Sequence, residues 1–514
     1  MTITVLCNDN TTTISFVDGQ TLLEVIRGEN VPVHAPCGGQ GTCEKCTVYL
    51  VTETGEQAVL ACRTAAEDGM TVRVPAASPL EVQLRAEDDA EVLVPDPGLA
   101  GYGVACDIGT TTVVCHLMDL ASGKKLATVG EGNAQRPYGG DVIARIKASM
   151  EGRRGALTAA ITGQLRRMIT ALCASAGVAV ADISCMSIAA NTTMCHLLTG
   201  LAPDGIGVSP FTPLSRFGDE WDAAALGLPF PGKVYIAPAI SGYVGGDITA
   251  DVLAADLDRA EKPTLLIDVG TNGEMALGCG EHFVCCSTAA GPAFEGAQIS
   301  CGMTAAAGAI SSVEWDGEKL CCGVIGGGEA VGLCGSGLID AMAVMLHLGA
   351  VDETGRMLDA EEDEDEIPQE ARPYLFLLED GEPAFRLTEQ VWVAQGDVRK
   401  LQLGKGAIAA GVQILIDAYG VGFEGIDALL LAGGFGSFIR PESAARIGLI
   451  PAELLHCTRA VGNTAALGAQ MALVSEEARA RLARLQETMD YKELSGLPEF
   501  NDAYMEAMMF PEED

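Results

Sequence analysis

Two stretches of the chain share one pattern, in which an apolar strand ends at an acidic residue and a polar glycine–threonine turn follows. The first stretch is residues 103–112 (GVACDIGTTT), and the second is residues 265–274 (LLIDVGTNGE). A short apolar run bounded by such a turn predicts a buried strand. The turn can direct backbone N–H groups and hydroxyls toward a phosphate. Because the pattern occurs twice, we predict two similar halves that face one ligand.

Other segments have patterns that fit the same ligand site. Residues 429–432 are a predicted buried strand, and the glycine turn 433–438 (GGFGSF) would let an adenosine lie flat on the backbone. Residues 463–469 (NTAALGA) begin a helix of small residues, which can pack closely against its counterpart at 245–250 (GGDITA). A close helix crossing between the two halves would form a hinge.

Several segments leave two interpretations open. Residues 133–146 fit either a ligand-binding segment or a plain loop with a helix cap. The glycine-rich loops 289–297 and 332–337 fit either close approach to a ligand or tight packing turns. Cys195 and His196 could be metal ligands, but a lone histidine beside a helix start is more often a hydrogen-bonded structural residue.

The N-terminal 75 residues have a different pattern, with short alternating strands around turns near residues 8–10 and 18–19. A helix is predicted from Thr21, because Thr21 and Glu24 have the spacing of a capping box. Further strands are expected near residues 47–50 and 71–74. We therefore predict a small module of strands with one helix.

Four cysteines of this module have the spacing C-x5-C-x2-C-x15-C: Cys37, Cys43, Cys46 and Cys62. Three thiolates from one glycine-rich loop leave backbone N–H groups able to bond the sulfurs of a small cluster. Structural zinc sites usually pair two short cysteine hooks, whereas Cys62 stands alone. The spacing favours a [2Fe–2S] cluster, with zinc or unligated thiols as the alternatives.

The composition and charge of the chain argue against several classes of function. The chain has 514 residues, 48% of them hydrophobic, so it can bury several cores in more than one domain. Its 70 acidic and 32 basic residues give a net charge of −38, which argues against nucleic acid and anionic membrane surfaces as partners. No secretory signal or membrane-length apolar run is visible, and the 18 cysteines suit a reducing compartment. We expect a cytoplasmic protein.

Residues 1–75 resemble a [2Fe–2S] ferredoxin of the β-grasp type, and residues 101–474 resemble the acetate and sugar kinase/Hsp70/actin superfamily. The combination is similar to the ATP-dependent reductive activators of corrinoid proteins. The resemblance implies an α+β β-grasp ferredoxin domain, followed by an α/β duplicated ribonuclease-H-like (actin/Hsp70-type) ATPase domain. The expected division is a ferredoxin domain at 1–78, a flexible tether at 79–100, ATPase halves at 101–262 and 263–475, and a C-terminal extension at 476–514.

The resemblance implies that the chain uses ATP to move one electron from a [2Fe–2S] cluster to Co(II) of a corrinoid protein, which regenerates Co(I) for methyl transfer. It implies ATP and Mg²⁺ as cofactors and an upstream low-potential electron donor, and it admits a homodimer. Asp107 and Asp268 would position Mg²⁺ through water or orient the attacking water, with Glu274 as a further catalytic candidate. The expected nucleotide contacts are Gly109, Thr110, Thr111, Thr112, Gly270, Thr271, Asn272, Gly273, Gly433, Gly434, Gly436 and Ser437.

Three other functions fit parts of the pattern. An ATP-dependent activator of another low-potential enzyme, such as a radical dehydratase, would use similar chemistry. A nucleotide-gated redox sensor would bind the same groups without turnover. A small-molecule kinase would share the ATP-binding fold but would leave the ferredoxin module without a task. Cluster-dependent ATPase activity stimulated by a Co(II) corrinoid protein separates the activator from all three.

Overall fold

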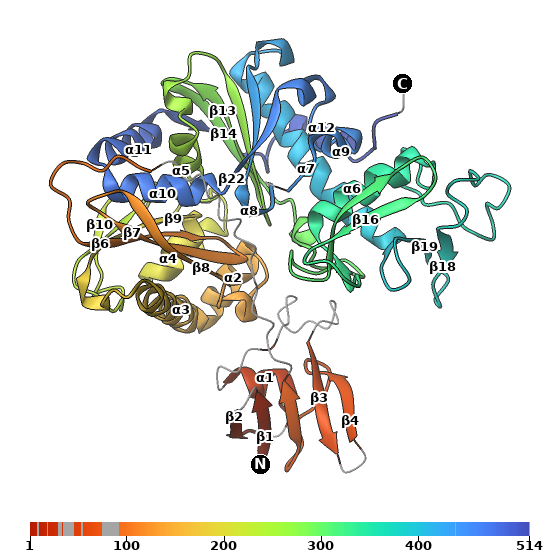
Figure 1. The fold of residues 1–514 in the computed structure, drawn as a ribbon, viewed down its shortest axis with the longest axis horizontal. Coiled ribbons are helices and arrows are strands. Elements are labelled where there is room, and N and C mark those ends of the chain that lie inside the picture. The colour runs from red at the N-terminus through yellow and green to blue at the C-terminus, as the bar shows by residue number, and fades with distance from the viewer. Residues whose placement is uncertain are drawn as a thin grey trace.

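The computed structural model contains a small N-terminal sheet and two larger sheets that face each other (Figure 1). Two three-stranded sheets lie outside these. The predicted doubling of the pattern is therefore visible in the architecture. The structure describes residues 1–7, 10–17, 19–28, 33, 46–52, 55–74, 92–436 and 438–512.

The N-terminal sheet has the strand order β2-β1-β5-β3-β4, with β1 parallel to β5. Apolar residues alternate along β1, so that Ile3 and Val5 enter a core that also contains Leu22 and Ile26 of the helix. The predicted capping box is confirmed, because the backbone N–H of Thr21 donates to Glu24 Oε2 at 2.8 Å. The elements are β1 (Thr2–Cys7), β2 (Asn10–Ser15), α1 (Leu22–Gly28), β3 (Thr47–Thr52), β4 (Gly55–Leu60) and β5 (Thr71–Val74).

The sheet of the first half has the order β10-β11-β9-β6-β7-β8. Strand β6 (Tyr102–Ile108) presents Val104 and Cys106 to the helix α3 (Arg154–Ala176). It presents Ala105 to the opposite face, where α10 (Thr464–Val474) packs. This period-two alternation is what a strand buried on both faces produces. The strands are β6 (Tyr102–Ile108), β7 (Thr112–Asp119), β8 (Lys124–Gly132), β9 (Ile183–Ala190), β10 (Glu220–Asp222) and β11 (Lys233–Ile236), and the helices are α2 (Val142–Ala148), α3 (Arg154–Ala176), α4 (Thr192–Thr199) and α5 (Gly246–Ala254).

The sheet of the second half has the order β22-β21-β12-β13-β14-β23. In each half, the first strand forms an antiparallel hairpin with the next strand of the chain. On its other side lie two further strands that run parallel to it and to each other. This shared arrangement confirms the predicted duplication. The helix α7 covers one face of this sheet, and α5 covers the other. The elements are β12 (Thr264–Val269), β13 (Gly273–Cys279), β14 (His282–Thr288), α7 (Gln395–Tyr419), β21 (Ala428–Ala432), α8 (Gly433–Gly436), β22 (Thr458–Gly462), α10 (Thr464–Val474) and β23 (Met489–Tyr491).

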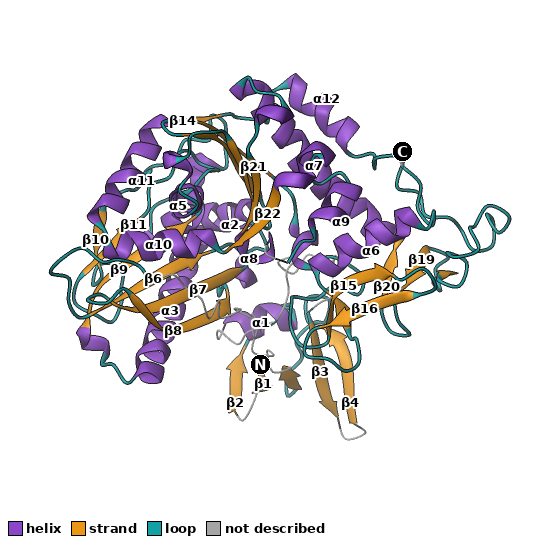
Figure 2. Ribbon diagram, turned by 45° about the horizontal axis from the view of Figure 1, so that its top comes forward, coloured by secondary structure: helices purple, strands orange, loops and turns teal. Residues whose placement is uncertain are grey.

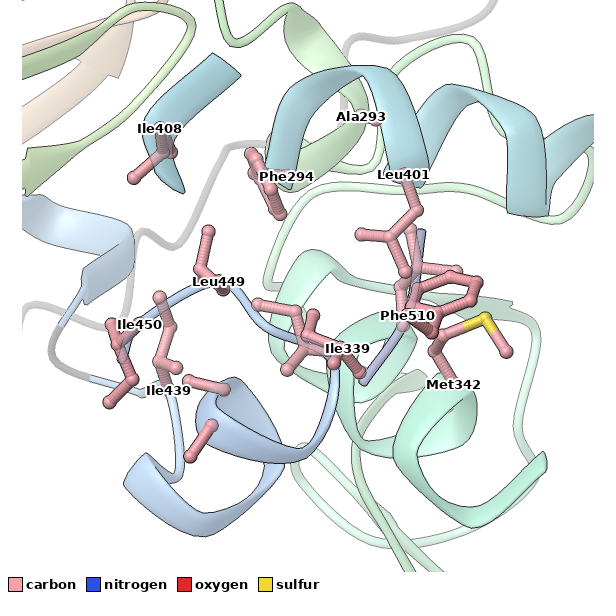
Figure 3. Close-up of a cluster of buried hydrophobic side chains, with 14 of the residues drawn as sticks. Ala293, Phe294, Ile339, Met342, Leu401, Ile408, Ile439, Leu449, Ile450 and Phe510 are labelled. Carbon is pink, nitrogen blue, oxygen red and sulfur yellow. The ribbon is translucent and has the colours of Figure 1, made fainter. Parts of the chain in front are cut away.

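A segment between β14 and α7 forms the small sheets. Of the C-terminal helices, α9 packs against α6 of this segment, α12 packs against α7, and α11 packs against α5. Figure 2 shows α12 beside α7. Figure 3 shows the shared core, in which Phe294, Ile339, Leu401 and Phe510 come together from distant parts of the chain. The elements are β15 (Ala309–Trp315), β16 (Leu320–Val324), β17 (Gly332–Leu333), α6 (Gly335–His347), β18 (Leu375–Leu377), β19 (Pro383–Arg386), β20 (Trp392–Ala394), α9 (Pro441–Arg446), α11 (Glu476–Thr488) and α12 (Pro498–Ala507).

Short helical turns connect these elements. Of the described helices, none has both the length and the apolar character needed to cross a membrane. The short turns are η1 (Arg136–Tyr138), η2 (Ser149–Arg153), η3 (Val180–Asp182), η4 (Asp204–Ile206), η5 (Leu257–Arg259), η6 (Pro292–Glu295), η7 (Phe423–Gly425) and η8 (Ala452–Cys457).

The end of the predicted tether is attached to the ATPase halves. The backbone N–H of Asp96 donates to Val474 O at 2.9 Å, and its Oδ2 accepts from the N–H of Glu476 at 2.6 Å. Leu93 and Leu99 pack on the apolar cluster of α10. Residues 92–100 are therefore anchored at the junction of α10 and α11, whereas the sequence pattern indicated only a flexible connection.

The helices α5 and α10 cross closely between the two sheets, as predicted. A Cβ atom on Gly468 would lie 2.3 Å from the carbonyl oxygen of Ala250, which only a glycine avoids. Both helices therefore depend on small residues where they meet.

Substitution Gly468→Ala is expected to destabilise the chain by about 1–3 kcal/mol, because the added methyl group forces the helix backbones apart. The same substitution at Gly163 in α3 is the control, since a Cβ there meets only the end of Arg167 at 3.9 Å. Gly163→Ala should be neutral or stabilising by up to about 1 kcal/mol through helix propensity. Urea denaturation of both variants measures the difference, and equal midpoints would contradict the packing argument.

Candidate functional site

The two predicted phosphate turns meet where the two halves face each other. The first turn lies between β6 and β7, and the second lies between β12 and β13. The hydroxyl oxygens of Thr111 and Thr271 are 3.1 Å apart. A Cβ atom on Gly109 would lie 2.8 Å from the carbonyl oxygen of Thr112, so the first turn requires its glycine. The structure therefore brings both turns to one place.

Carboxylates from both halves surround these turns. Asp107 and Asp268 lie near the ends of the equivalent strands β6 and β12, and both are partly open to solvent. Asp107 Oδ2 accepts from Asn463 Nδ2 at 2.9 Å. Buried Asp251 of α5 accepts from Thr464 Oγ1 at 2.6 Å, and its carboxyl group lies within hydrogen-bond reach of that of Asp268. The connecting helices thus contribute side chains to the predicted site.

Burial raises the pKa values of five carboxylates at this place: Asp107, Asp247, Asp251, Asp268 and Glu274. Neighbouring negative charges raise the pKa values further for all of them except Asp247. Burial raises the pKa of Asp107 and Asp268 to about 7, and that of Asp247 to about 6. The pKa values of Asp251 and Glu274 are also raised. The main influences on these pKa values are burial, neighbouring carboxylates and hydrogen bonds, and none of these main influences is a cationic side chain of the described ranges. A cation bound among these carboxylates would relieve their mutual repulsion.

The stability of the metal-free chain is expected to rise as the pH falls from 8 to 6. The folded-state pKa values of Asp107 and Asp268 exceed the unfolded value, so the folded state binds more protons between about pH 4 and pH 7. Stability therefore decreases as the pH rises through this window. Thermal unfolding with a chelator present measures the effect, and Asp268→Asn should show a smaller pH dependence. An unchanged slope in this variant would contradict the assignment.

Glu274 and the second turn are held together locally. Asn272 Nδ2 donates to Glu274 Oε1 at 2.9 Å, and Glu274 lies opposite Asp268 in the register of β12 and β13. Gly273 packs against Ile408 of α7, and this contact holds the turn in place. Glu274 is therefore near the predicted site but engaged with the turn itself.

The predicted adenosine turn lies beside the second carboxylate. A Cβ atom on Gly433 would lie 2.2 Å from Asp268 Oδ1, and the φ of Gly433 is +89°, so this position requires glycine on two counts. A Cβ on Gly434 would meet no atom within 4 Å. Gly436 packs against Leu431 of β21, whereas Ser437 lies outside the described residues. The glycine turn thus borders the site on the side of the second half.

Arg145 is a site residue that the sequence pattern did not single out. Its fully buried guanidinium donates from Nη2 to the carbonyl oxygen of Thr110 at 2.5 Å and from Nε to that of Gly139 at 3.0 Å. Asn191 Nδ2 donates to Thr110 Oγ1 at 3.0 Å, so the first turn is fixed from two sides. The segment 133–146 therefore supports the site. The only sequence signal was an arginine within the apolar periodicity of a helix.

Of three other candidates, His196 and the loop 332–337 have structural roles, whereas the loop 289–297 lies at the site. His196 is buried, with Nδ1 2.7 Å from Thr192 O and Nε2 accepting from the N–H of Leu214 at 3.1 Å. In the loop 332–337, Gly332 and Gly337 pack against neighbouring chain atoms, as a packing turn would. The loop 289–297, in contrast, brings Glu295 to the phosphate turns.

Two of the predicted cluster cysteines are described, and they lie together. Cys46 Sγ and Cys62 Sγ are 3.2 Å apart, and the N–H of Cys62 donates to Cys46 Sγ at 3.4 Å. These two sulfurs are close enough to ligate one metal atom. Cys37 and Cys43 lie outside the described residues. Within the described part of the chain, no group of three or more Cys, His, Asp or Glu side chains is arranged to hold a metal ion directly.

Comparison with protein families divides the chain into three matched parts. Residues 5–67 match the 2Fe-2S iron-sulfur cluster binding domain, residues 102–260 match the RACo middle region, and residues 262–514 match the C-terminal domain of RACo, the ASKHA domain. The matches confirm the predicted fold class, a ferredoxin domain followed by an actin-like ATPase domain, and with it the expected [2Fe–2S] cluster and ATP.

Individual relatives agree with this division. The corrinoid activation enzyme RamQ of Eubacterium limosum is 31% identical over 95% of both chains. The [Co(II) methylated amine-specific corrinoid protein] reductase of Methanosarcina barkeri is 27% identical over 74% of this chain and 71% of its own. The solved structure of a reductive activator for corrinoid, iron–sulfur protein is 30% identical, covers 99% of this chain and 98% of its own, and superposes with a TM-score of 0.73. This chain therefore belongs to the family of reductive activators of corrinoid proteins.

Proposed function

We propose that this chain uses ATP to transfer one electron from its [2Fe–2S] cluster to Co(II) of a corrinoid protein, which regenerates Co(I) for methyl transfer. The proposal rests on one observation, that the chain contains both a ferredoxin domain and an ATPase domain. The first contains the thiol pair Cys46–Cys62, and the second contains the pair of facing turns with Thr111 and Thr271.

The energetic need for ATP follows from redox chemistry. Plant-type [2Fe–2S] centres have potentials near roughly −400 mV. A cobalt couple on the order of 100–200 mV lower would require roughly 2–5 kcal/mol for one electron. Differential binding of a partner by two conformations can supply an energy of this size. The helix pair α5–α10 lies between the halves and is suited to be the element that changes.

The carboxylates fit a Mg²⁺ ion that keeps its waters. Mg²⁺ takes oxygen ligands and is commonly held by one or two carboxylates together with substrate phosphates. Asp107 and Asp268 would hold the ion through water, and the buried carboxylate of Asp251 beside Asp268 supports this use of the site. The ion would neutralise charge on the phosphates. Asp268 would also orient water next to the glycine turn, since its Oδ1 lies against Gly433.

The remaining expectations belong to this proposal. We expect a corrinoid protein of a methyltransferase system as partner, an upstream low-potential donor, a cytoplasmic location, and a homodimer as one possible assembly. The domain limits 1–78, 79–100, 101–262, 263–475 and 476–514 stay predictions.

An optical assay tests the proposed function. Anaerobically purified protein, reduced chemically, is mixed with a Co(II) corrinoid protein, and Co(I) is followed with and without Mg-ATP. Co(I) should appear only with ATP, and ADP is the matched control. Absence of Co(I) with several corrinoid proteins of the same organism, despite an intact cluster and bound ATP, would overturn the proposal in favour of a dehydratase activator or a sensor.

A further inference from the structure

Glu295, at the end of η6, lies between the two phosphate turns. Its carboxylate accepts from the hydroxyl of Thr111 in the first half, and from both the hydroxyl and the backbone N–H of Thr271 in the second half. Its Oε1 lies 3.9 Å from the position that a Cβ on Gly270 would take, so the side chain covers the second turn. One carboxylate therefore uses donors from both turns.

The same donors are those that a phosphate would need. Turn hydroxyls and backbone N–H groups bind phosphate oxygens, and a carboxylate oxygen is an acceptor of the same charged kind. Arg136 of the first half lines a cavity of about 70 Å³ together with Thr111 and Glu295, and its charge favours an anion at this place. A carboxylate and a terminal phosphate would thus compete for one position.

The expected place of the nucleoside indicates which phosphate would compete with Glu295. The glycine turn at Gly433 borders Asp268 and belongs to the second half. If the nucleoside lies on this turn, the first phosphates would lie nearest the second half, and the terminal phosphate would be the one that meets Thr111 of the first half. A diphosphate would leave the contact between Glu295 and Thr111 in place.

We infer that Glu295 occupies the position of the terminal phosphate of ATP, so that a triphosphate displaces it and a diphosphate does not. This inference rests on the proposed function, since it assumes that the site binds ATP. Glu295 is then a residue that determines the discrimination between ATP and ADP.

The residues that follow Glu295 are fixed to α7, so a displacement of Glu295 would strain this segment. Gln298 has a backbone φ of +63°, a value that residues other than glycine rarely adopt. Its carbonyl oxygen accepts from Lys400 of α7, and the N–H of Ser300 donates to Asp397 Oδ1 at 3.0 Å. Movement of Glu295 would therefore act on a segment that is fixed to α7 only three residues later.

Nucleotide affinities test the inference. Calorimetry measures binding of ADP and of the non-hydrolysable analogue AMPPNP, each with Mg²⁺, to the wild-type chain, Glu295→Gln and Glu424→Gln. Glu424 is the matched control, because it is an exposed glutamate of another short turn, η7. Loss of the charge-assisted bonds in Glu295→Gln should tighten AMPPNP binding about tenfold and leave ADP within about twofold. Glu424→Gln should match the wild type.

Each outcome has a distinct meaning. Equal changes for both nucleotides, no change, or weaker AMPPNP binding in Glu295→Gln would overturn the inference, while wild-type binding leaves the proposed function intact. A wild-type chain that binds neither nucleotide would overturn the proposed function together with the inference. If Glu295→Gln does not fold in a thermal scan, Glu295→Asp carries the same test, because its shorter side chain withdraws the carboxylate from both hydroxyls.

Discussion

Asp268→Asn is expected to abolish ATP-dependent formation of Co(I), with at least about a 100-fold loss of ATPase rate, while the visible spectrum of the cluster is unchanged. Asp268 lies where the second turn, the glycine turn and α5 meet, and its Oδ1 lies against Gly433. The amide keeps the shape of the side chain but removes the charge that would hold Mg²⁺ through water. ATP hydrolysis and Co(I) formation are measured on the same preparation.

A matched control is available on the neighbouring strand. Asp427 is exposed at the opposite end of β21 and forms an ion pair with Lys262 at 2.8 Å. Asp427→Asn should retain wild-type turnover, because exposed ion pairs contribute little. If Asp268→Asn turned over ATP at the wild-type rate, Asp268 would have no role in the reaction. A more stable Asp268→Asn chain at pH 8 would show that the loss of turnover is not a loss of folding.

Cys46→Ser is expected to reduce Co(I) formation to the level seen without protein, with nucleotide binding retained. Cys46 is buried beside Cys62, and a serine hydroxyl is a much poorer ligand than a thiolate for the iron of a [2Fe–2S] cluster. Iron content and the visible spectrum report the cluster, and calorimetry with AMPPNP reports the ATPase domain. The two readouts separate the electron-carrying part of the chain from the nucleotide-binding part.

Cys321→Ser is the control for this variant, because Cys321 is an exposed thiol of β16 in a different part of the fold. It should keep both the iron and the Co(I) activity. Full iron content and activity in Cys46→Ser would show that the cluster is held by other residues. Loss of AMPPNP binding in Cys46→Ser would instead indicate that the ferredoxin domain is needed for the ATPase fold.

The sequence predicted those features that are encoded locally and repeated. An apolar strand followed by an acidic residue and a glycine–threonine turn is a short-range signal, and its recurrence at Asp107 and Asp268 predicted two facing halves. The small residues around Gly468 predicted a close helix crossing for the same reason, since glycine is required where two backbones approach. The capping box at Thr21 is equally local.

The sequence did not predict side chains that join the site from distant segments. In the sequence, Arg145 is one basic residue in a helical pattern. Only the fold brings its guanidinium to the carbonyl oxygen of Thr110 in the first turn. Asp251 reads as a polar position of α5, yet it is buried beside Asp268 because two sheets close over that helix. Glu295 lies in a glycine-rich loop 184 residues after Thr111 in the chain. Contacts of this kind depend on tertiary packing, which no short pattern encodes.

The anchored end of the tether sets a geometric limit on the electron-carrying domain. Val74 ends the ferredoxin sheet, and Leu93 is packed near α10. The chain between these two residues can span at most roughly 63–68 Å when fully extended. The end of the ferredoxin sheet therefore lies no farther than this from the junction of α10 and α11, in any arrangement of the two parts. A rotation of α10 would move the fixed point from which this distance is measured, and would thereby change the region open to the ferredoxin domain without any change in that domain itself.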